Sequence, residues 1–500
     1  MSGPGHERRY YRRQPERDLL YRTLQDNLET FVATSREQGG DLPQHVRHEL
    51  YGYLDCGILA RGAARVACEV CHDSIWVAYS CKGRGFCPAC CARRMNDTAA
   101  HLVDRVIPRV PVRQWVLSLP FRLRYLCARD ASLVRAVLRI FVQSVNRCLR
   151  RLCRRAGIRT AQCGSVTAVQ RFASSLGLNV HLHVLFLDGV FRRVAPDSAP
   201  VFEAVPKLAD TDVARVAAQV QKRVSALLEK RGLAAADAAD GAPEEDDLFA
   251  RLCAASVQGR IATGPKAGWR VSKIAGAPVL LSPKPATLCA QVDGFNVHAT
   301  ARIHENDRKA LERLCRYMLR PPLARERLTQ IENGQLRYEL KRPWSDGTTH
   351  LLFTPDELIE RLCALVPPPK SHLVLYHGVL ASHASWRKEI LPEPQTPWLP
   401  PWEQPQDVPS VPLTPPRATS SQDASPAHRA RRLSWAALLK RIFSLEMLKC
   451  SRCGGRRKVI SFVTDPGALA RICSSLGVSP EAPPLRPARP PPQVELDFFG

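Results

Sequence analysis

The stretch Asn179-Val180-His181-Leu182-His183-Val184-Leu185-Phe186-Leu187-Asp188-Gly189 is apolar on both faces and ends in a turn. A strand of this kind is typical of the interior of a sheet. His181 and His183 lie two residues apart, so they share one face, and at about 6.6 Å along the strand two imidazoles can bind one cation. Gln170 ends a preceding strand-like run, 164–170, and could supply a third ligand. The pattern predicts a buried central strand with a metal site, although a core histidine is more often structural.

Residues 307–320 have the pattern of a helix that starts near an aspartate cap and ends at a proline. Tyr317 flanks its apolar stripe, and Arg313 and Arg320 lie four residues before and three residues after it, on the same side. A phenol beside two guanidiniums suits attack on a phosphodiester, because the guanidiniums hold the phosphate and oppose the developing charge. The alternative is a surface tyrosine that packs its ring and exposes its hydroxyl.

Two CxxC pairs, Cys68 with Cys71 and Cys87 with Cys90, have the spacing of a zinc ribbon. Two such turns can present four thiolates to one tetrahedral Zn²⁺, so these four cysteines are predicted to form a structural zinc site. Further residues close in sequence could build a second site or remain free in the core, namely Cys56, His72, Cys81 and Cys91.

A third CxxC, Cys450 with Cys453, supplies only two ligands. Cys473 and His428 are the nearest further candidates for a zinc site there, and a turn without metal is an equally good interpretation. The chain has 18 cysteines and no apolar signal segment near its start, so we expect a reducing cytosol in which paired cysteines bind metal.

The balance of charge predicts a polyanionic partner, nucleic acid first. Lys plus Arg number 72 against 47 Asp plus Glu, which gives a net charge of +25 and a pI near 9.7. Part of this excess is explained by the codon usage of a GC-rich genome. A helix predicted between Asp130 and Gly157 carries five arginines in its last turns. Besides Arg147 they are the four that we expect to contact phosphate, Arg150, Arg151, Arg154 and Arg155.

No run of 18 apolar residues occurs, so the sequence predicts no membrane span. The predicted organisation is a helical region at 1–50, a zinc-binding domain at 51–100, a catalytic domain at 101–390, a Pro-rich linker at 391–430, and a C-terminal CxxC module with a tail at 431–500.

Long runs spread along residues 40–390 resemble the rolling-circle transposases of the HUH superfamily, of the insertion-sequence type with an N-terminal transposase zinc-binding domain. The runs are CGILARG at 56–62, SCKGRGFCPAC at 80–90, RQWVLSLP at 113–120, HLHVLFLDGV at 181–190, DGFNVHA at 293–299, RYMLRPPLA at 316–324, KRPWSDGTTHL at 341–351 and LYHGVLASHASWR at 375–387.

The resemblance implies an α+β fold, in which an HUH endonuclease-type central antiparallel sheet is flanked by helices and accompanied by the two cysteine modules. His181 and His183 match the pair that binds Mg²⁺ or Mn²⁺, and Tyr317 matches the nucleophile. Founding members have two tyrosines four residues apart, but Arg313 occupies the first position here. The chain therefore resembles the single-tyrosine branch, which needs a homodimer or a second use of the same tyrosine.

The implied reaction is cleavage and rejoining of single-stranded DNA at element ends and target through a 5′-phosphotyrosine, in the bacterial cytoplasm at the nucleoid. The chain has no GxxxxGK[ST] motif, so helicase work must come from a host protein. Two alternatives stay open: a replication initiator with the same chemistry, and a non-catalytic zinc-dependent DNA-binding protein derived from a transposase.

Overall fold

The computed structural model describes residues 12–38, 40–233, 247–277, 287–392, 435–443 and 446–490. Nearly all of the predicted Pro-rich linker lies outside these ranges, and so does His428, one of the candidate C-terminal ligands. The predictions about these two features are therefore not addressed by the structure.

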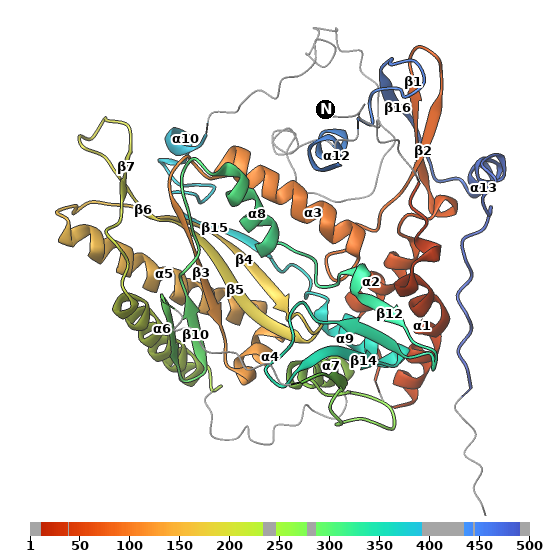
Figure 1. Cartoon of the computed structure of the whole chain (residues 1–500), viewed down its shortest axis with the longest axis horizontal. Coiled ribbons are helices and arrows are strands. Elements are labelled where there is room, and N and C mark those ends of the chain that lie inside the picture. Colours follow the sequence, from red (N-terminus) through yellow and green to blue (C-terminus); the bar gives the residue numbers. More distant parts are fainter. Residues whose placement is uncertain are drawn as a thin grey trace, which may run out of the picture.

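A seven-stranded antiparallel sheet lies at the centre of the catalytic region (Figure 1). Its strands are, in spatial order, β15 (Val374–Gly378), β4 (Gly164–Phe172), β5 (Leu178–Leu187), β3 (Val112–Ser118), β10 (Phe295–His298) and β9 (Cys289–Val292), and β11 (Arg302–Ile303) also pairs with β3. The strand that carries the two histidines is β5, which pairs with β4 on one side and β3 on the other. The predicted α+β class and the central histidine strand are confirmed.

Helices surround this sheet, and none of the described helices combines the length and apolar character that a membrane crossing requires. They are α1 (Leu19–Glu37), α2 (Gln44–Asp55), α3 (Pro88–His101), α4 (Phe121–Arg129), α5 (Ala131–Arg155), α6 (Asp210–Lys230), α7 (Leu248–Gln258), α8 (Arg308–Met318), α9 (Pro355–Leu365), α10 (Arg387–Ile390), α12 (Trp435–Phe443) and α13 (Pro466–Ser475).

Capping side chains start two of these helices where the sequence predicts them. The Asp130 carboxylate accepts a hydrogen bond from the backbone N–H of Ser132 at 2.6 Å, at the start of α5. The Asp307 carboxylate accepts from the backbone N–H of Ala310 at 2.8 Å, at the start of α8. Each cap satisfies a backbone donor that the first turn leaves unpaired, which stabilises a helix by about 1 kcal/mol.

Two different helical layers cover the two faces of the sheet. Val180 and Leu182 of β5 join the larger hydrophobic core, to which α4 and α5 also contribute. Leu185 and Leu187 join a second core with the buried side of α8. Alternate residues of a strand point to opposite faces, so the two histidines of β5 face α8 rather than α5.

The register of the sheet places polar residues side by side on the face that α8 covers. Directly opposed residues of antiparallel strands share a face. One row runs from β4 to β10 and consists of Gln170, His181, Ser118 and Asn296. In the next row, His183 and His298 lie on either side of Val116. The catalytic region therefore has a row of polar side chains across the middle of its sheet, on the face that α8 covers.

Two smaller strand assemblies complete the catalytic region. A four-stranded sheet consists of β12 (Leu328–Gln330), β13 (Leu336–Glu339), β14 (Thr348–Phe353) and β8 (Ser272–Ala275) in that order. A hairpin consists of β6 (Gly189–Arg192) and β7 (Val201–Ala204). The connection from β13 to β14 contains Lys341, which extends toward α8.

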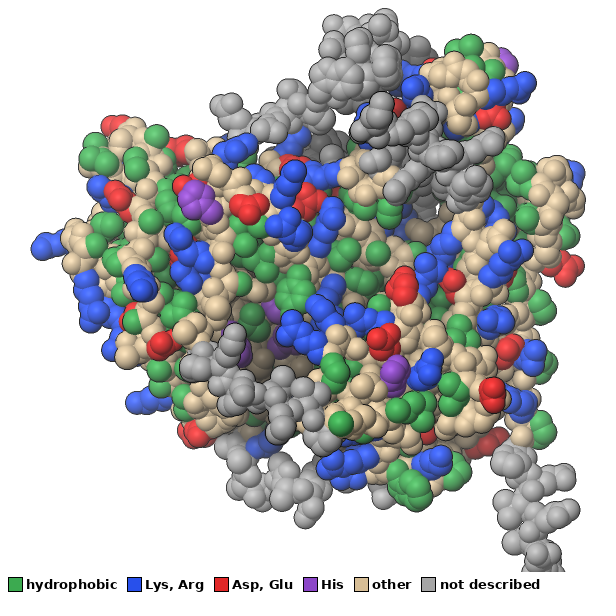
Figure 2. All heavy atoms as spheres, in the orientation of Figure 1, with side chains coloured by type: hydrophobic (Ala, Val, Ile, Leu, Met, Phe, Trp, Pro, Cys, Tyr) green, Lys and Arg blue, Asp and Glu red, His purple; other side chains and the backbone are tan. Residues whose placement is uncertain are grey.

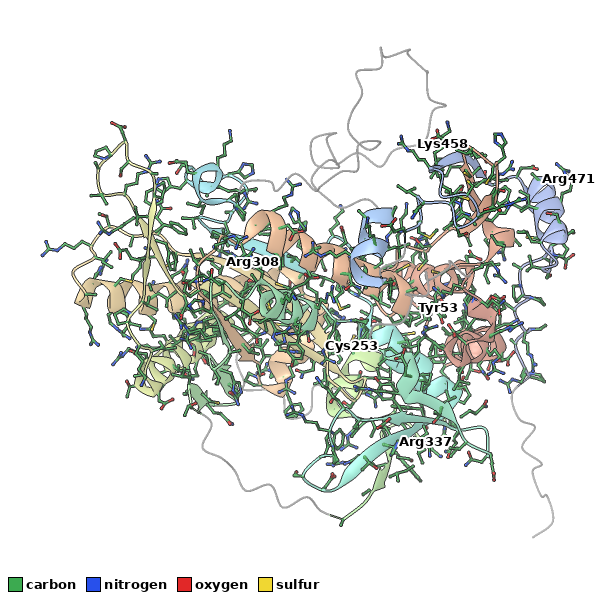
Figure 3. All side chains as sticks on the ribbon, turned by 45° about the horizontal axis from the view of Figure 1, so that its top comes forward. Tyr53, Cys253, Arg308, Arg337, Lys458 and Arg471 are labelled. Carbon is green, nitrogen blue, oxygen red and sulfur yellow. The ribbon has the colours of Figure 1, made fainter. Side chains whose placement is uncertain are left out.

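The C-terminal segment is built into the N-terminal region. Strand β16 (Arg457–Val463) pairs with β1 (Ala63–Cys68), which also pairs with β2 (Ser74–Ala78). Further along the chain, the Gln25 side chain of α1 donates to the Pro484 carbonyl at 2.8 Å. Figure 3 shows Lys458 and Arg471 of this segment on the same side of the molecule as Tyr53 of α2. The one strand in the described part of the predicted module at 431–500 belongs to the sheet of the N-terminal hairpin.

Candidate active site and zinc centres

The two histidines of β5 are held so that each can present one nitrogen outward. Their ring centroids lie 4.9 Å apart. The Nδ1 atom of His181 lies 2.9 Å from the Asn179 carbonyl, and that of His183 lies 2.9 Å from the amide of Gln114. Nδ1–H of His181 donates to the Asn179 carbonyl, which leaves its Nε2 lone pair for a metal. At His183 the atom facing Nδ1 is the amide nitrogen of Gln114, and exchange of the amide oxygen and nitrogen of Gln114 would let Nδ1–H donate in the same way. The contact from Gln114 was missed by the sequence pattern, because Gln114 is a β3 residue that only strand pairing brings to β5.

Both imidazoles are neutral at neutral pH. Burial lowers the pKa of His183 to about 3, with smaller contributions from the nearby His181 and Arg320. Burial also lowers the pKa of His181, with Arg320 and Arg124 acting in the same direction. Desolvation disfavours the imidazolium form, so the lone pairs are available to a cation without the loss of a proton.

Gln170, the candidate third metal ligand, lies directly opposite His181 on the neighbouring strand β4. Its Nε2 donates to the carbonyls of Tyr317 at 3.1 Å and Met318 at 2.7 Å, at the end of α8. Its Oε1 is buried and has no hydrogen-bond donor within the part of the chain that the structure describes. A buried acceptor without a donor beside two neutral imidazoles fits a cation site formed by His181, His183 and Gln170.

Tyr317 lies at the last turn of α8, directly beside this group. Its ring centroid lies 5.7 Å from that of His183, with the two planes 86° apart. The side chain is 43% exposed, whereas Cys315 and Met318 on either side of it are buried in the core. The amphipathic pattern of α8 therefore anchors the helix and leaves the phenol between the histidines and solvent.

Two cations from different elements contact the phenol. The Arg320 guanidinium carbon lies 5.7 Å from the Tyr317 ring centroid, and the Lys341 Nζ lies 5.4 Å from it. Arg313 is exposed one helical turn earlier, and none of the contacts recorded for the described residues joins it to Tyr317. The pattern 341–351 was part of the family resemblance, but nothing in its spacing connects Lys341 to a tyrosine 24 residues away.

The surface around this centre is hollowed and basic on one side. Figure 2 shows histidine side chains within a hollow near the middle of the face that it draws, bordered by a group of Lys and Arg side chains. Because phosphate contacts provide most of the affinity for DNA, this border suits the approach of a strand to the phenol.

The predicted phosphate-contacting arginines of α5 do not border this centre, because α5 packs on the opposite side of the sheet from α8. Arg151 donates to the Asp212 carboxylate of α6 at 2.7 Å, and its role in phosphate contact stays a prediction. The other three, Arg150, Arg154 and Arg155, are exposed. They form a basic surface on the far layer of the molecule.

Eight of the cysteines form two clusters of four. The predicted grouping of Cys68 and Cys71 with Cys87 and Cys90 is wrong. The first cluster consists of Cys56, Cys81, Cys87 and Cys90, and the second of Cys68, Cys71, Cys450 and Cys453. Cys68 and Cys71 lie at the tip of the β1–β2 hairpin, whereas Cys87 caps α3 at its start. The hairpin carries the first pair away from α3, and the pairing of β16 with β1 brings the C-terminal CxxC to it.

Both clusters fit a tetrahedral zinc ion. Sulfur pairs in the first lie 3.4 to 3.7 Å apart, and so do pairs in the second. Four thiolates at about 2.3 Å from Zn²⁺ place their sulfurs about 3.8 Å apart. Two other candidate ligands, His72 and Cys91, belong to neither cluster. Cys473 packs instead in an apolar cluster with Leu59 and Leu469. Two structural zinc sites are therefore supported, with ligands that differ from the predicted set.

We expect the intact chain to bind two zinc ions that differ in their release. Cys453 is exposed, whereas Cys56, Cys87 and Cys90 are buried, so a chelator should remove the ion of the second cluster first. Cys87→Ser should unfold the N-terminal region, and Cys453→Ser should remove one zinc from a folded chain. Metal analysis and far-ultraviolet circular dichroism check both; one zinc per folded wild-type chain would contradict the expectation.

Two family models match the chain. Residues 164–388 match a family described as "Putative transposase", and residues 23–119 match the "Transposase zinc-binding domain". The first match contains the histidines of β5 and Tyr317, and the second contains the whole first cysteine cluster; Cys450 and Cys453 lie outside both. No curated protein and no solved structure matches the chain significantly.

Proposed function

Because the chain belongs to the transposases that carry an N-terminal transposase zinc-binding domain, we propose that it cleaves and rejoins single-stranded DNA through a 5′-phosphotyrosine on Tyr317. This is the chemistry of an HUH endonuclease in rolling-circle transposition of an insertion sequence. The observation that carries the proposal is the contact between the Tyr317 ring and His183, beside the unpaired oxygen of Gln170.

In the proposed cleavage step, the Tyr317 oxygen attacks the scissile phosphorus. A bond forms between that oxygen and phosphorus, the bond from phosphorus to the 3′ oxygen breaks, the phenol loses its proton, and the 3′ oxygen gains one. His181, His183 and Gln170 would hold Mg²⁺ or Mn²⁺, which polarises a phosphate oxygen when bound. Arg320 and Lys341 hold the phosphate and stabilise the charge that develops on it.

Rejoining is the same step in reverse with another 3′-OH as the nucleophile. The phosphotyrosine conserves the energy of the broken phosphodiester, so neither step needs a nucleotide cofactor. One tyrosine per chain must serve two strand transfers, which requires a homodimer or reuse of Tyr317. Strand separation would come from a host helicase.

A nicking assay tests the proposal. Full-length protein with Mn²⁺ or Mg²⁺ is incubated with end-labelled single-stranded DNA that carries the ends of the neighbouring element. We expect a covalent adduct on a denaturing gel, and peptide mapping should place it on Tyr317. An adduct on Tyr376 would assign another nucleophile, and metal-dependent binding without any cleavage would favour a non-catalytic DNA-binding protein.

We expect the two cations beside Tyr317 to affect the rate of cleavage more than the affinity for DNA. Arg320→Gln and Lys341→Gln should each slow adduct formation. The activation free energy should rise by about 2–4 kcal/mol, the range for losing one stabilising donor at a developing charge. Arg313→Gln is the comparison, since it removes the same charge from an exposed position of α8 that has no recorded contact with Tyr317. Single-turnover rates measure the difference; equal losses in all three variants would assign Arg313 to the scissile phosphate as well.

A further inference from the structure

The second cysteine cluster joins the two ends of the chain. Cys68 and Cys71 come from the N-terminal hairpin, and Cys450 and Cys453 come from the segment that follows α12. The sulfurs of Cys71 and Cys450 lie 3.7 Å apart, and those of Cys68 and Cys453 lie 3.5 Å apart. A metal ion here would fix the start of the C-terminal segment at one point of the N-terminal region.

Helix α12 lies directly before this point and contacts the helix that carries Tyr317. Arg441 of α12 donates to the Glu312 carboxylate of α8 at 2.7 Å. It also pairs with both oxygens of Asp104, which follows α3. The side chain of Glu312 is 18% exposed and that of Arg441 is 27% exposed, so this contact is partly shielded from water. Glu312 precedes Tyr317 by five residues on the same short helix.

Few polar contacts fix α8 in place, so the contact from Arg441 is a substantial part of its support. At the start of the helix, Arg308, which is labelled in Figure 3, donates to the carbonyls of Ile107 at 2.9 Å and Pro108 at 3.2 Å. At the end, Gln170 donates to the last carbonyls. Glu312 lies between these two anchors, and it also pairs with Arg316 at 2.5 Å.

The charge balance of Glu312 agrees with a firmly held ion pair. Partial burial alone would raise the pKa of this carboxyl group, but Arg441 and Arg316 lower it below its usual range. The carboxylate is therefore ionised at neutral pH and attracts both guanidiniums. Loss of Arg441 leaves a partly buried carboxylate with Arg316 alone, which belongs to the same helix and cannot fix α8 to another element.

A metal ion at the second cluster would favour the position of α12 at α8. Between residue 392 and α12 the chain runs through residues 393–434, whereas only a few residues separate α12 from Cys450. A short tether to a fixed point gives a much higher effective concentration of Arg441 at α8 than a long connection does.

We propose that the zinc site of Cys68, Cys71, Cys450 and Cys453 holds α12 against α8, and that Arg441 is a positioning residue for Tyr317. This rests on the proposed role of Tyr317 as the nucleophile. The C-terminal segment thereby supports the active site through α8. None of its recorded contacts is with the phenol or the histidines.

Three variants of the full chain test the proposal. Cys450→Ser combined with Cys453→Ser should lower the zinc content from two ions to one. Arg441→Gln should keep both ions. Both variants should increase amide hydrogen exchange in residues 308–318 and slow single-turnover adduct formation by roughly 2- to 30-fold, the range for coupling through packed networks. The affinity for single-stranded DNA should change less than twofold. Arg471→Gln, which removes one charge from α13 of the same segment, is the control and should match wild type.

A double-mutant cycle between Arg441→Gln and Glu312→Gln adds a readout that a general loss of stability does not move. The combined loss should be smaller than the sum of the two single losses. The proposal is overturned if Arg441→Gln has the exchange and rate of Arg471→Gln, or if the cysteine variant loses one zinc and keeps wild-type exchange in α8. Zinc content and exchange do not depend on the chemistry of Tyr317, so these results stand even if the adduct maps to another residue.

Discussion

Tyr317→Phe is expected to abolish the covalent adduct with single-stranded DNA and to leave the fold and the affinity for DNA unchanged. The variant removes one oxygen from a side chain that is 43% exposed, while the buried residues of α8 stay in place. Removal of the nucleophile of a serine protease lowers the rate by about 10⁶-fold, and we expect a comparably large loss here. The adduct on a denaturing gel and the binding curve as a function of salt measure the two effects.

Tyr376→Phe is the matched control for this variant. Tyr376 belongs to β15 at the edge of the same sheet, and its ring is covered by the Arg387 guanidinium at 5.7 Å from its centroid. It should form the adduct at the wild-type rate. If Tyr317→Phe still forms the adduct, the nucleophile has been assigned to the wrong residue, whatever the control shows.

His183→Ala and His181→Ala are expected to remove the metal-dependent cleavage while most of the affinity for DNA remains. Each substitution removes one of the two neutral imidazoles that face α8, and it leaves only one imidazole and the Gln170 oxygen to hold a divalent cation. Affinity should persist because it comes mainly from contacts between basic side chains and phosphates. Cleavage should also stop in a chelator and return with Mn²⁺ or Mg²⁺.

His298→Ala separates the effect of the metal site from that of a lost histidine on the same sheet. His298 lies two strands away from His183 in the same row, and burial lowers its pKa as well. It should retain metal-dependent cleavage, and thermal unfolding should show that all three variants are folded. Wild-type cleavage by the doubly substituted His181→Ala, His183→Ala chain would exclude the histidine site.

The sequence by itself determined the elements that carry the chemistry. An apolar run with His181 and His183 two residues apart predicts a buried strand with both imidazoles on one face. The aspartate cap and the apolar stripe around Tyr317 fix the start and the buried side of α8. These features depend on residues close in the chain, so they are readable from local periodicity and capping.

Tertiary structure alone decided which distant residues meet. A CxxC turn looks the same whatever completes its metal site, so Cys68 and Cys71 could not be assigned to Cys450 and Cys453 until β16 was paired with β1. Gln114 reaches His183 only through the register of β3 with β5, and Lys341 reaches Tyr317 only through the folding of a separate sheet. Such contacts depend on the pairing of segments far apart in sequence, which no local pattern encodes.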